Sequence, residues 1–231
     1  MKAALAFVLL AVAAVHGRST ALEGEASSTG LANLGENPWL VHLRIAVSTS
    51  GFLNTCGGSL IHENWVVTSS SCITDSRFIW VRFGLVTVWN PELVTETSTV
   101  VVHPNFNANN LDNNIGLINT IRVIHTSANI RPIGIIGFNT PPEAFFCGFG
   151  ARDNNNAGEQ LRCFDLNISR IGIHITGTAI GGEPTRFDVG GGLINGNLLV
   201  GMYSHANADG TFAYACSACY RHWIEGITGP L

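Results

Sequence analysis

Serine, histidine and cysteine are the side chains of this sequence that could carry chemistry. The 231 residues include eight histidines and six cysteines. A serine hydroxyl next to a histidine base can attack an acyl carbon. The candidate bases are His103 and His205, and the candidate hydroxyls are Ser70 and Ser71. Lysine chemistry is excluded once a leader is removed, because Lys2 is the only lysine in the chain.

The last two cysteines, Cys216 and Cys219, form a Cys-x-x-Cys motif. In a cytosolic protein this spacing indicates redox catalysis, whereas in a secreted protein it favours a local structural disulfide. With His222 the motif would supply three zinc ligands, but the sequence contains no complete four-ligand pattern. We therefore predict no metal site and no cofactor.

The composition excludes several classes of protein. Charged residues make up only 12% of the chain, apolar residues make up 46%, and the formal net charge is −4. These values exclude a disordered chain and a coiled coil, and they give no reason to expect nucleic acid as a partner. The 26 glycines have no triplet period, so they exclude collagen and favour the many tight turns of an all-β fold.

Residues 1–17 predict a secretory signal peptide, because Lys2 precedes an apolar run that ends near small Gly17. The run is shorter than the roughly 20 residues of a membrane span, so we predict a secreted, extracellular protein without membrane insertion. An N-terminal anchor is the alternative. Six cysteines in a secreted chain favour disulfides, and Asn167-Ile168-Ser169 is a glycosylation sequon.

Short apolar runs separated by turn residues predict an antiparallel barrel or sandwich. Asn195-Gly196 predicts a hairpin turn, and the spacing of Cys219, Trp223 and Ile227 predicts one helix. The asparagine-rich segment 151–159 is expected to be a mobile loop. The expected strands are 39–45, 59–61, 65–69, 78–83, 99–103, 116–119, 144–149, 160–166, 193–194, 198–203 and 212–215, with a further stretch near 126–131.

Three motifs resemble the trypsin/chymotrypsin-like serine proteases. They are Cys56-Gly57-Gly58-Ser59-Leu60-Ile61 with Cys72, His103-Pro104-Asn105-Phe106 leading into Asn114-Ile115-Gly116-Leu117, and Asp188-Val189-Gly190-Gly191. The resemblance implies an all-β fold of two six-stranded antiparallel β-barrels with a cleft between them. It places a short pro-segment or extension at 18–20 and a trypsin-like domain at 21–231. The N-terminal barrel is expected at about 21–125, the C-terminal barrel at about 126–217 and the helix at about 218–228.

The resemblance also locates the catalytic triad, and none of the three positions keeps the family's residue. Ser71 stands at the histidine position, Asn114 at the aspartate position and Val189 at the nucleophile position. Serine is not a base near pH 7, an amide carries no charge, and valine has no atom that attacks a carbonyl. The sequence therefore predicts an inactive pseudoenzyme, a non-catalytic serine protease homologue of a kind often found in arthropods.

Five further positions predict an altered cleft. By the resemblance, Glu183 stands at the base of the substrate pocket, Thr185 replaces a cysteine of the pocket wall, and Phe187 replaces a glycine of the oxyanion hole. Ser204 is retained, and His205 replaces the tryptophan beside it.

The activation device of the family is also altered. Its aspartate is retained as Asp188, but Arg18 lies about two residues too far from the segment that would form the new N-terminus. We expect local hydrogen bonds to satisfy Asp188, because buried carboxylates normally find partners. Whether Arg18 is cleaved stays open.

The resemblance implies a disulfide between Cys56 and Cys72. The other four cysteines do not match common pairs of the family. Cys147 and Cys163 are expected on adjacent strands, which favours a cross-strand bridge, and Cys216 and Cys219 then remain as a local bridge.

Three functions follow from these observations. The first is a binding protein, such as a cofactor, decoy or recognition module of a protease cascade, with a protein, peptide or glycan as its ligand. The alternatives are a hydrolase with unorthodox catalytic residues, such as Ser70 or Ser71 with a distant histidine, and a storage or structural secretory protein. The sequence does not determine the partner, the tissue or the oligomeric state.

Overall fold

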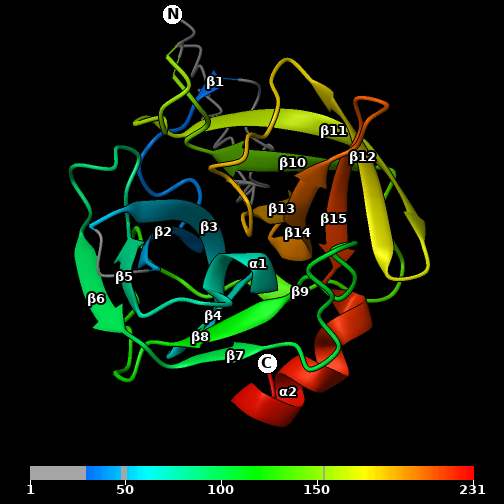
Figure 1. Cartoon of the computed structure of the whole chain (residues 1–231). Coiled ribbons are helices and arrows are strands. Elements are labelled where there is room, and N and C mark those ends of the chain that lie inside the picture. Colours follow the sequence, from blue (N-terminus) through cyan, green and yellow to red (C-terminus); the bar gives the residue numbers. More distant parts are fainter. Residues whose placement is uncertain (1–29, 48–50, 153) are drawn as a thin grey trace, which may run out of the picture.

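The computed structural model describes residues 30–47, 51–152 and 154–231. The predicted signal peptide at 1–17, the extension at 18–20 and Arg18 lie outside the described residues. The fold is all-β, with two barrel-like sheets side by side and a short C-terminal helix (Figure 1). This confirms the predicted fold class. Within the described residues, no helix has both the length and the apolar character needed to cross a membrane.

The first sheet has the strand order β6-β5-β2-β3-β4-β8-β7. One segment of chain, residues 93–102, supplies both edges, because β6 pairs with β5 and β7 pairs with β8. This segment therefore wraps the sheet into a barrel. The strands are β2 (Leu40–Ala46), β3 (Leu53–His62), β4 (Trp65–Thr68), β5 (Phe78–Phe83), β6 (Leu93–Thr97), β7 (Val100–Val102) and β8 (Gly116–Asn119).

The second sheet closes on itself, because β11 pairs with both β10 and β12. Its ring has six strands, β10 to β15, and the two-residue strands β1 and β9 are added at its margin. The strands are β1 (Gly30–Leu31), β9 (Gly134–Ile135), β10 (Glu143–Gly148), β11 (Arg162–Ile171), β12 (His174–Ile180), β13 (Gly192–Asn195), β14 (Leu198–Ala206) and β15 (Phe212–Cys216).

Alternating burial explains why these segments form barrel strands. In β2 the side chains of Val41, Leu43 and Ile45 are buried in the first core, and β5 repeats the pattern. Side chains two residues apart share one face of a strand, so His42 and Arg44 of β2 lie on the opposite, outer face. That outer face becomes important for a second pocket, described below.

The sequence did not predict the two-residue strands β1 and β9, the longer strands β6 and β12, or one helix. In β12 an inward position is taken by Gly177, where a Cβ would lie 2.8 Å from Leu166 Cδ2, so the apolar alternation is broken. In β6 the buried positions are the threonines Thr95 and Thr97. The helix α1 (Ser70–Ile73) has only four residues, too few for a periodic pattern. The stretch 126–131 forms no strand.

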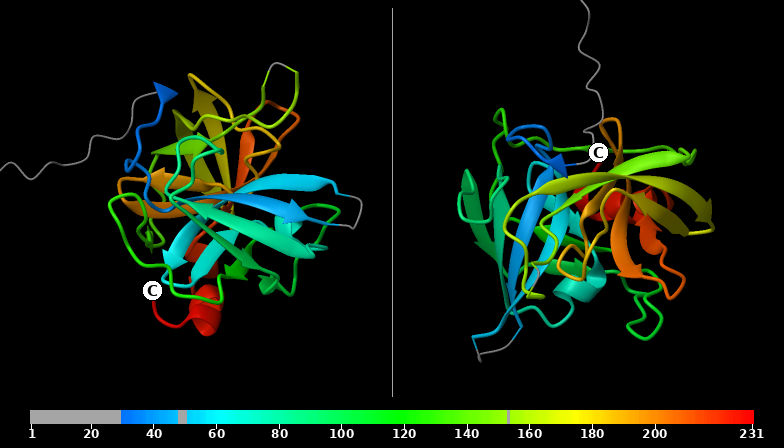
Figure 2. Two further views of the ribbon diagram at one scale, coloured as in Figure 1. Left: turned by 90° about the vertical axis from the view of Figure 1, so that its left-hand side faces the viewer. Right: turned by 90° about the horizontal axis from the view of Figure 1, so that it is seen from above.

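The C-terminal segment folds as expected. A 3₁₀ turn η1 (Ala218–Tyr220) leads into α2 (Arg221–Thr228), which lies at one end of the molecule, outside the barrels (Figures 1 and 2). Ile224 is fully buried, and the ring of Trp223 lies 4.8 Å from that of His103. Packing against the barrels therefore stabilises a helix that is too short to persist alone.

Three disulfides are present, Cys56–Cys72, Cys147–Cys163 and Cys216–Cys219, which are the three expected pairings. Each of the first two closes a loop with a sequence separation of 16, a length for which the chain-entropy argument gives about 3 kcal/mol of stabilisation. The thiols of the Cys-x-x-Cys motif are consumed by the third disulfide, so they are not available as zinc ligands. In the described part of the chain, no three His, Cys, Asp or Glu side chains are grouped as a metal site would need.

Candidate functional site

The three triad positions meet where the two barrels touch. Ser71 lies in α1, Asn114 precedes β8, and Val189 precedes β13. The Ser71 backbone N–H donates to Asn114 Oδ1 at 2.8 Å, and Asn114 Nδ2 donates to Ser204 Oγ at 2.8 Å. Asn114 is only 1% exposed. Its amide therefore links the first barrel to the second through one accepted and one donated hydrogen bond.

Replacing Asn114 with alanine is expected to lower the free energy of unfolding by about 2 kcal/mol, because the substitution removes the two hydrogen bonds of a buried amide. Urea denaturation measures the change. Asn110→Ala is the control, since that amide is exposed, and its effect should stay within about 0.5 kcal/mol. Equal effects of the two substitutions would show that the hydrogen bonds of Asn114 between the barrels do not stabilise the folded protein.

A cavity of about 440 Å³ lies beside the triad positions. Ser71, Phe187 and Val189 all line it, so the structure brings these three predicted residues together. Arg186 adds a cation, with its guanidinium carbon 4.7 Å from the centre of the Phe187 ring. The remaining lining residues are Leu53, Asn54, Thr55, Cys56 and Cys72. The cavity thus combines apolar side chains with polar ones and one positive charge.

The backbone N–H at the oxyanion position already has a partner. Phe187 N–H donates to Thr185 Oγ1 at 3.3 Å. Thr185 in turn donates from its N–H and from its hydroxyl to Asp188 Oδ2, both at 2.8 Å. Thr185, predicted on a pocket wall, is therefore an anchor for Asp188.

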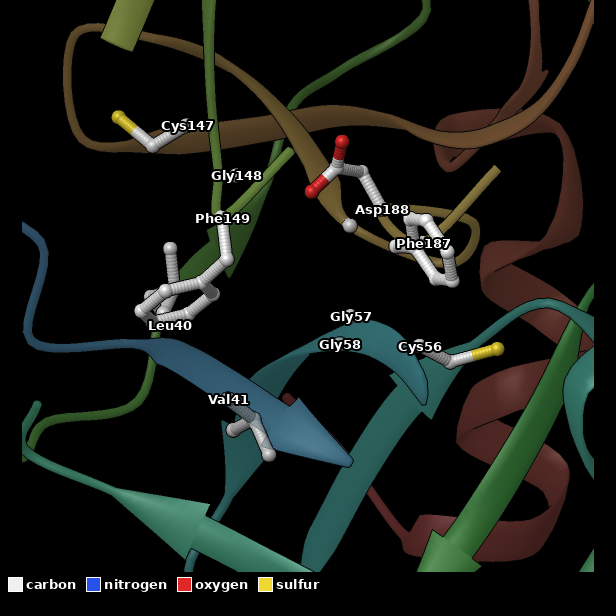
Figure 3. Close-up of a pocket in the computed structure, with 11 residues that line it drawn as sticks. Leu40, Val41, Cys56, Gly57, Gly58, Cys147, Gly148, Phe149, Phe187 and Asp188 are labelled. Atoms are coloured by element: carbon white, nitrogen blue, oxygen red, sulfur yellow. The ribbon is translucent and has the colours of Figure 1, made fainter. Parts of the chain in front are cut away.

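Asp188 is satisfied by local hydrogen bonds, as expected. Besides the two bonds from Thr185, its Oδ1 accepts the Gly150 N–H at 2.8 Å. Figure 3 shows the carboxylate pointing toward the segment of Gly148 and Phe149, while the Phe187 ring points away from it. Burial raises the pKa of the Asp188 carboxyl, and the N–H and hydroxyl donors around it act in the opposite direction. The close approach requires Gly148, where a Cβ would collide with the carboxylate.

Glu183 does not lie at the base of a pocket, which corrects the expectation from the sequence. It is exposed, in the irregular segment between β12 and β13. The carboxylate is therefore not enclosed as a specificity determinant would be.

Ser204 and His205 form a pair that the sequence did not predict. The distance between Ser204 Oγ and His205 Nδ1 is 3.0 Å. Consecutive residues of a regular strand point to opposite faces, but the register of β14 against β15 shifts between Tyr203 and His205. Burial lowers the pKa of His205, and nearby His174 lowers it further. The result is a buried hydroxyl beside an imidazole with a weakened affinity for protons.

The other candidate groups have structural roles. His103 packs its ring against Tyr220 and Trp223, at 5.3 and 4.8 Å, and its Nδ1 accepts the Asn105 N–H. The Ser70 hydroxyl donates to the Ile115 carbonyl. Neither group lines the cavity at the triad positions. Asn167 is exposed on β11, so its sequon is accessible.

The two barrels and the cleft between them define a trypsin-like serine protease fold. Residues 28–224 match the family model of trypsin, and the chain belongs to the trypsin family. It is 26% identical to trypsin alpha of Drosophila melanogaster over 91% of this chain and 90% of that protein. It is 27% identical to human kallikrein-15 over 96% and 95% of the two chains. Among solved structures, HL collagenase superposes with a TM-score of 0.79 at 23% identity, covering 88% of this chain and 98% of the collagenase.

These comparisons contradict the prediction that the chain is not an enzyme. The relatives are named as proteases, and they match the chain over nearly its whole length. The prediction rested on the three triad positions and on Phe187 at the oxyanion position. The hydrogen-bond contact between Ser204 and His205 is a feature that it did not include.

Proposed function

We propose that this trypsin-family protein binds a peptide segment of a partner protein in the cleft between its barrels. The observation that carries the proposal is the lining of the cavity at the triad positions, where Phe187 and Val189 present apolar side chains to the space beside Ser71. In this role the protein would serve as a cofactor, decoy or recognition module, for example in a protease cascade.

The lining also favours a particular ligand chemistry. Leu53, Phe187 and Val189 would contact an apolar side chain, and burial of such a side chain drives binding. Arg186 is exposed, and its only hydrogen bond among the described residues is from Nη2 to the Asn155 carbonyl, at 3.2 Å. A carboxylate next to the apolar side chain would pair with this guanidinium. The preferred peptide is thus apolar with a neighbouring acidic residue.

Selection from a displayed peptide library, followed by calorimetric titration of the enriched peptides, tests the proposal. Val189→Arg should abolish binding, because it fills the cavity. Arg186→Gln should weaken binding about tenfold, the value of one charged hydrogen bond. Arg162→Gln is the matched control, since Arg162 is exposed on β11 and away from the cavity. Peptides that bind the Val189 variant as tightly as the natural protein would refute the cleft as the binding site.

Serine-type hydrolysis is the second candidate, favoured by the 3.0 Å contact of Ser204 Oγ with His205 Nδ1 and by the names of the relatives. A hydroxyl in contact with a base is the arrangement that nucleophilic catalysis uses. A fluorophosphonate probe distinguishes the two candidates. Hydrolysis predicts an adduct that maps to Ser204, disappears in Ser204→Ala and forms slowly in His205→Gln. Peptide binding without any adduct supports the first candidate.

The protein is further proposed to be secreted and glycosylated. The sequence of the leader, the exposure of Asn167 and the three disulfides support this proposal. The mature chain would then comprise the extension at 18–20 and the trypsin-like domain at 21–231.

Expression of the full chain in animal cells should place the protein in the medium with Arg18 as its first residue, because cleavage is expected after Gly17. The natural protein should carry one glycan that a glycosidase removes, and Asn167→Gln should lack the corresponding increase in mass. Retention of the protein in the cells with Met1 still present would refute the secretion proposal.

A further inference from the structure

A second pocket lies on the outer face of the first barrel, next to the cavity at the triad positions, with which it shares Thr55. Its floor is formed by neighbouring strands, since His42 pairs with Arg82 in register and Arg44 pairs with Thr55. The segments 86–90 and 157–160 meet above the sheet, where the Val88 N–H donates to the Glu159 carbonyl at 3.0 Å. Together they enclose about 270 Å³.

The charge of this pocket is positive although the protein as a whole is negative. Its lining contains Arg44, Arg82 and Arg152 against the single acid Glu159. Glu159 is already paired with Arg152. Among the described residues, Arg44 and Arg82 have no acidic partner, and Arg82 uses Nη1 to donate to the Val88 carbonyl at 3.1 Å. Two guanidinium groups thus face one cavity without a counter-ion.

One residue of the lining carries an unpartnered buried atom. His42 lines the pocket, is only 4% exposed and packs edge-on against the Phe149 ring at 5.0 Å. Its Nδ1 is buried and has no hydrogen-bond partner among the described residues. This nitrogen is closed to solvent, so the His42 ring contributes to the pocket as part of its floor and not through Nδ1.

We propose that this pocket binds the sulfate group of a sulfated sugar. The guanidinium groups of Arg44 and Arg82 present the planar forks that hold a tetrahedral oxyanion through paired N–H donors. The His42 ring forms part of the floor beneath them. Trp89 lies at the rim and is 71% exposed, so its indole offers a flat apolar face to the sugar ring. The hydroxyl of Thr55 and the amide of Asn156 line the same space as partners for sugar hydroxyls.

Calorimetric titration of the purified protein tests the site with three probes: inorganic sulfate, a sulfated disaccharide and the same disaccharide without sulfate. The sulfated disaccharide should bind best and the unsulfated one should not bind. Arg44→Gln and Arg82→Gln should each weaken binding of the sulfated disaccharide about tenfold or more. Trp89→Ala should weaken binding of the sulfated disaccharide but leave the affinity for inorganic sulfate unchanged. Arg131→Gln removes the same charge at an exposed position outside the pocket and should have no effect.

A readout at the site itself separates specific binding from general attraction. The nitrogen resonances of the His42 ring should shift on addition of the sulfated disaccharide, and Arg44→Gln should suppress that shift. Equal weakening by Arg131→Gln would overturn the proposal, because it would indicate attraction to net charge alone. Tighter binding of a phosphorylated sugar would overturn the choice of sulfate. If Arg82→Gln does not fold, Arg44→Gln alone decides, since the Arg44 side chain makes no hydrogen bond to any of the described residues.

Discussion

Gly190→Ala is expected to destabilise the protein by about 4 kcal/mol, which combines the cost of a left-handed backbone with that of overpacking. Gly190 has φ +84°, and a Cβ there would lie 2.6 Å from the Gly57 carbonyl oxygen and would collide with Thr68 Oγ1. The Gly190 N–H also donates to the Tyr203 carbonyl at 2.8 Å. Atoms of the first barrel therefore leave no room for a side chain on this residue of the second barrel.

Gly196→Ala is the matched control. Gly196 has φ +57°, but no atom lies within 4 Å of a Cβ built there. Only the backbone cost of about 1–2 kcal/mol remains at this hairpin position. Urea denaturation of the two variants measures both effects, and their difference isolates the steric contact between the barrels. Similar losses in both variants would mean that the loops at Gly190 can move apart, which would contradict the tight contact of the two barrels.

Acidification from pH 7.5 to pH 5 is expected to cost the folded protein about 2 kcal/mol through His42 alone. Burial, and then the charges of Arg82 and Arg44, lower the pKa of His42 from 6.5 to about 3. Between these two values the unfolded chain binds a proton that the folded chain does not. Stability due to His42 is therefore complete above pH 6.5 and is lost progressively as the pH falls toward 3.

His42→Phe should flatten the pH dependence of unfolding over this range, because it removes the titrating group from the site. Asp188 acts in the opposite sense, because its pKa is raised in the folded protein and its contribution to stability is lost as the pH rises through that pKa. The effect of His42 is therefore measured as the difference between the natural protein and the variant. His222→Gln, at an exposed position, is the control and should leave the profile unchanged. An unchanged profile in His42→Phe would show that the imidazole is solvated rather than buried.

Much of the fold could be predicted from the sequence because its signals are local. Alternating apolar residues such as those of 39–45 and 78–83 define barrel strands, and Asn195-Gly196 defines the β13–β14 hairpin. The motif around Cys56 and Cys72 carries the family resemblance, and the match over residues 28–224 places the chain in the trypsin family. Strands β6 and β12 could not be found in this way, because threonine and glycine occupy inward positions where local patterns require apolar side chains.

The sequence alone determined which residues the family resemblance assigns to the triad positions, namely Ser71, Asn114 and Val189. Only the tertiary structure decided what these and neighbouring side chains contact. Asn114 bridges two barrels, and the register shift in β14 brings Ser204 to His205. Likewise, Arg44 and Arg82 share one pocket because β2 pairs with β5. Such contacts depend on strand register, which is set by packing between segments far apart in the chain and leaves no local signal.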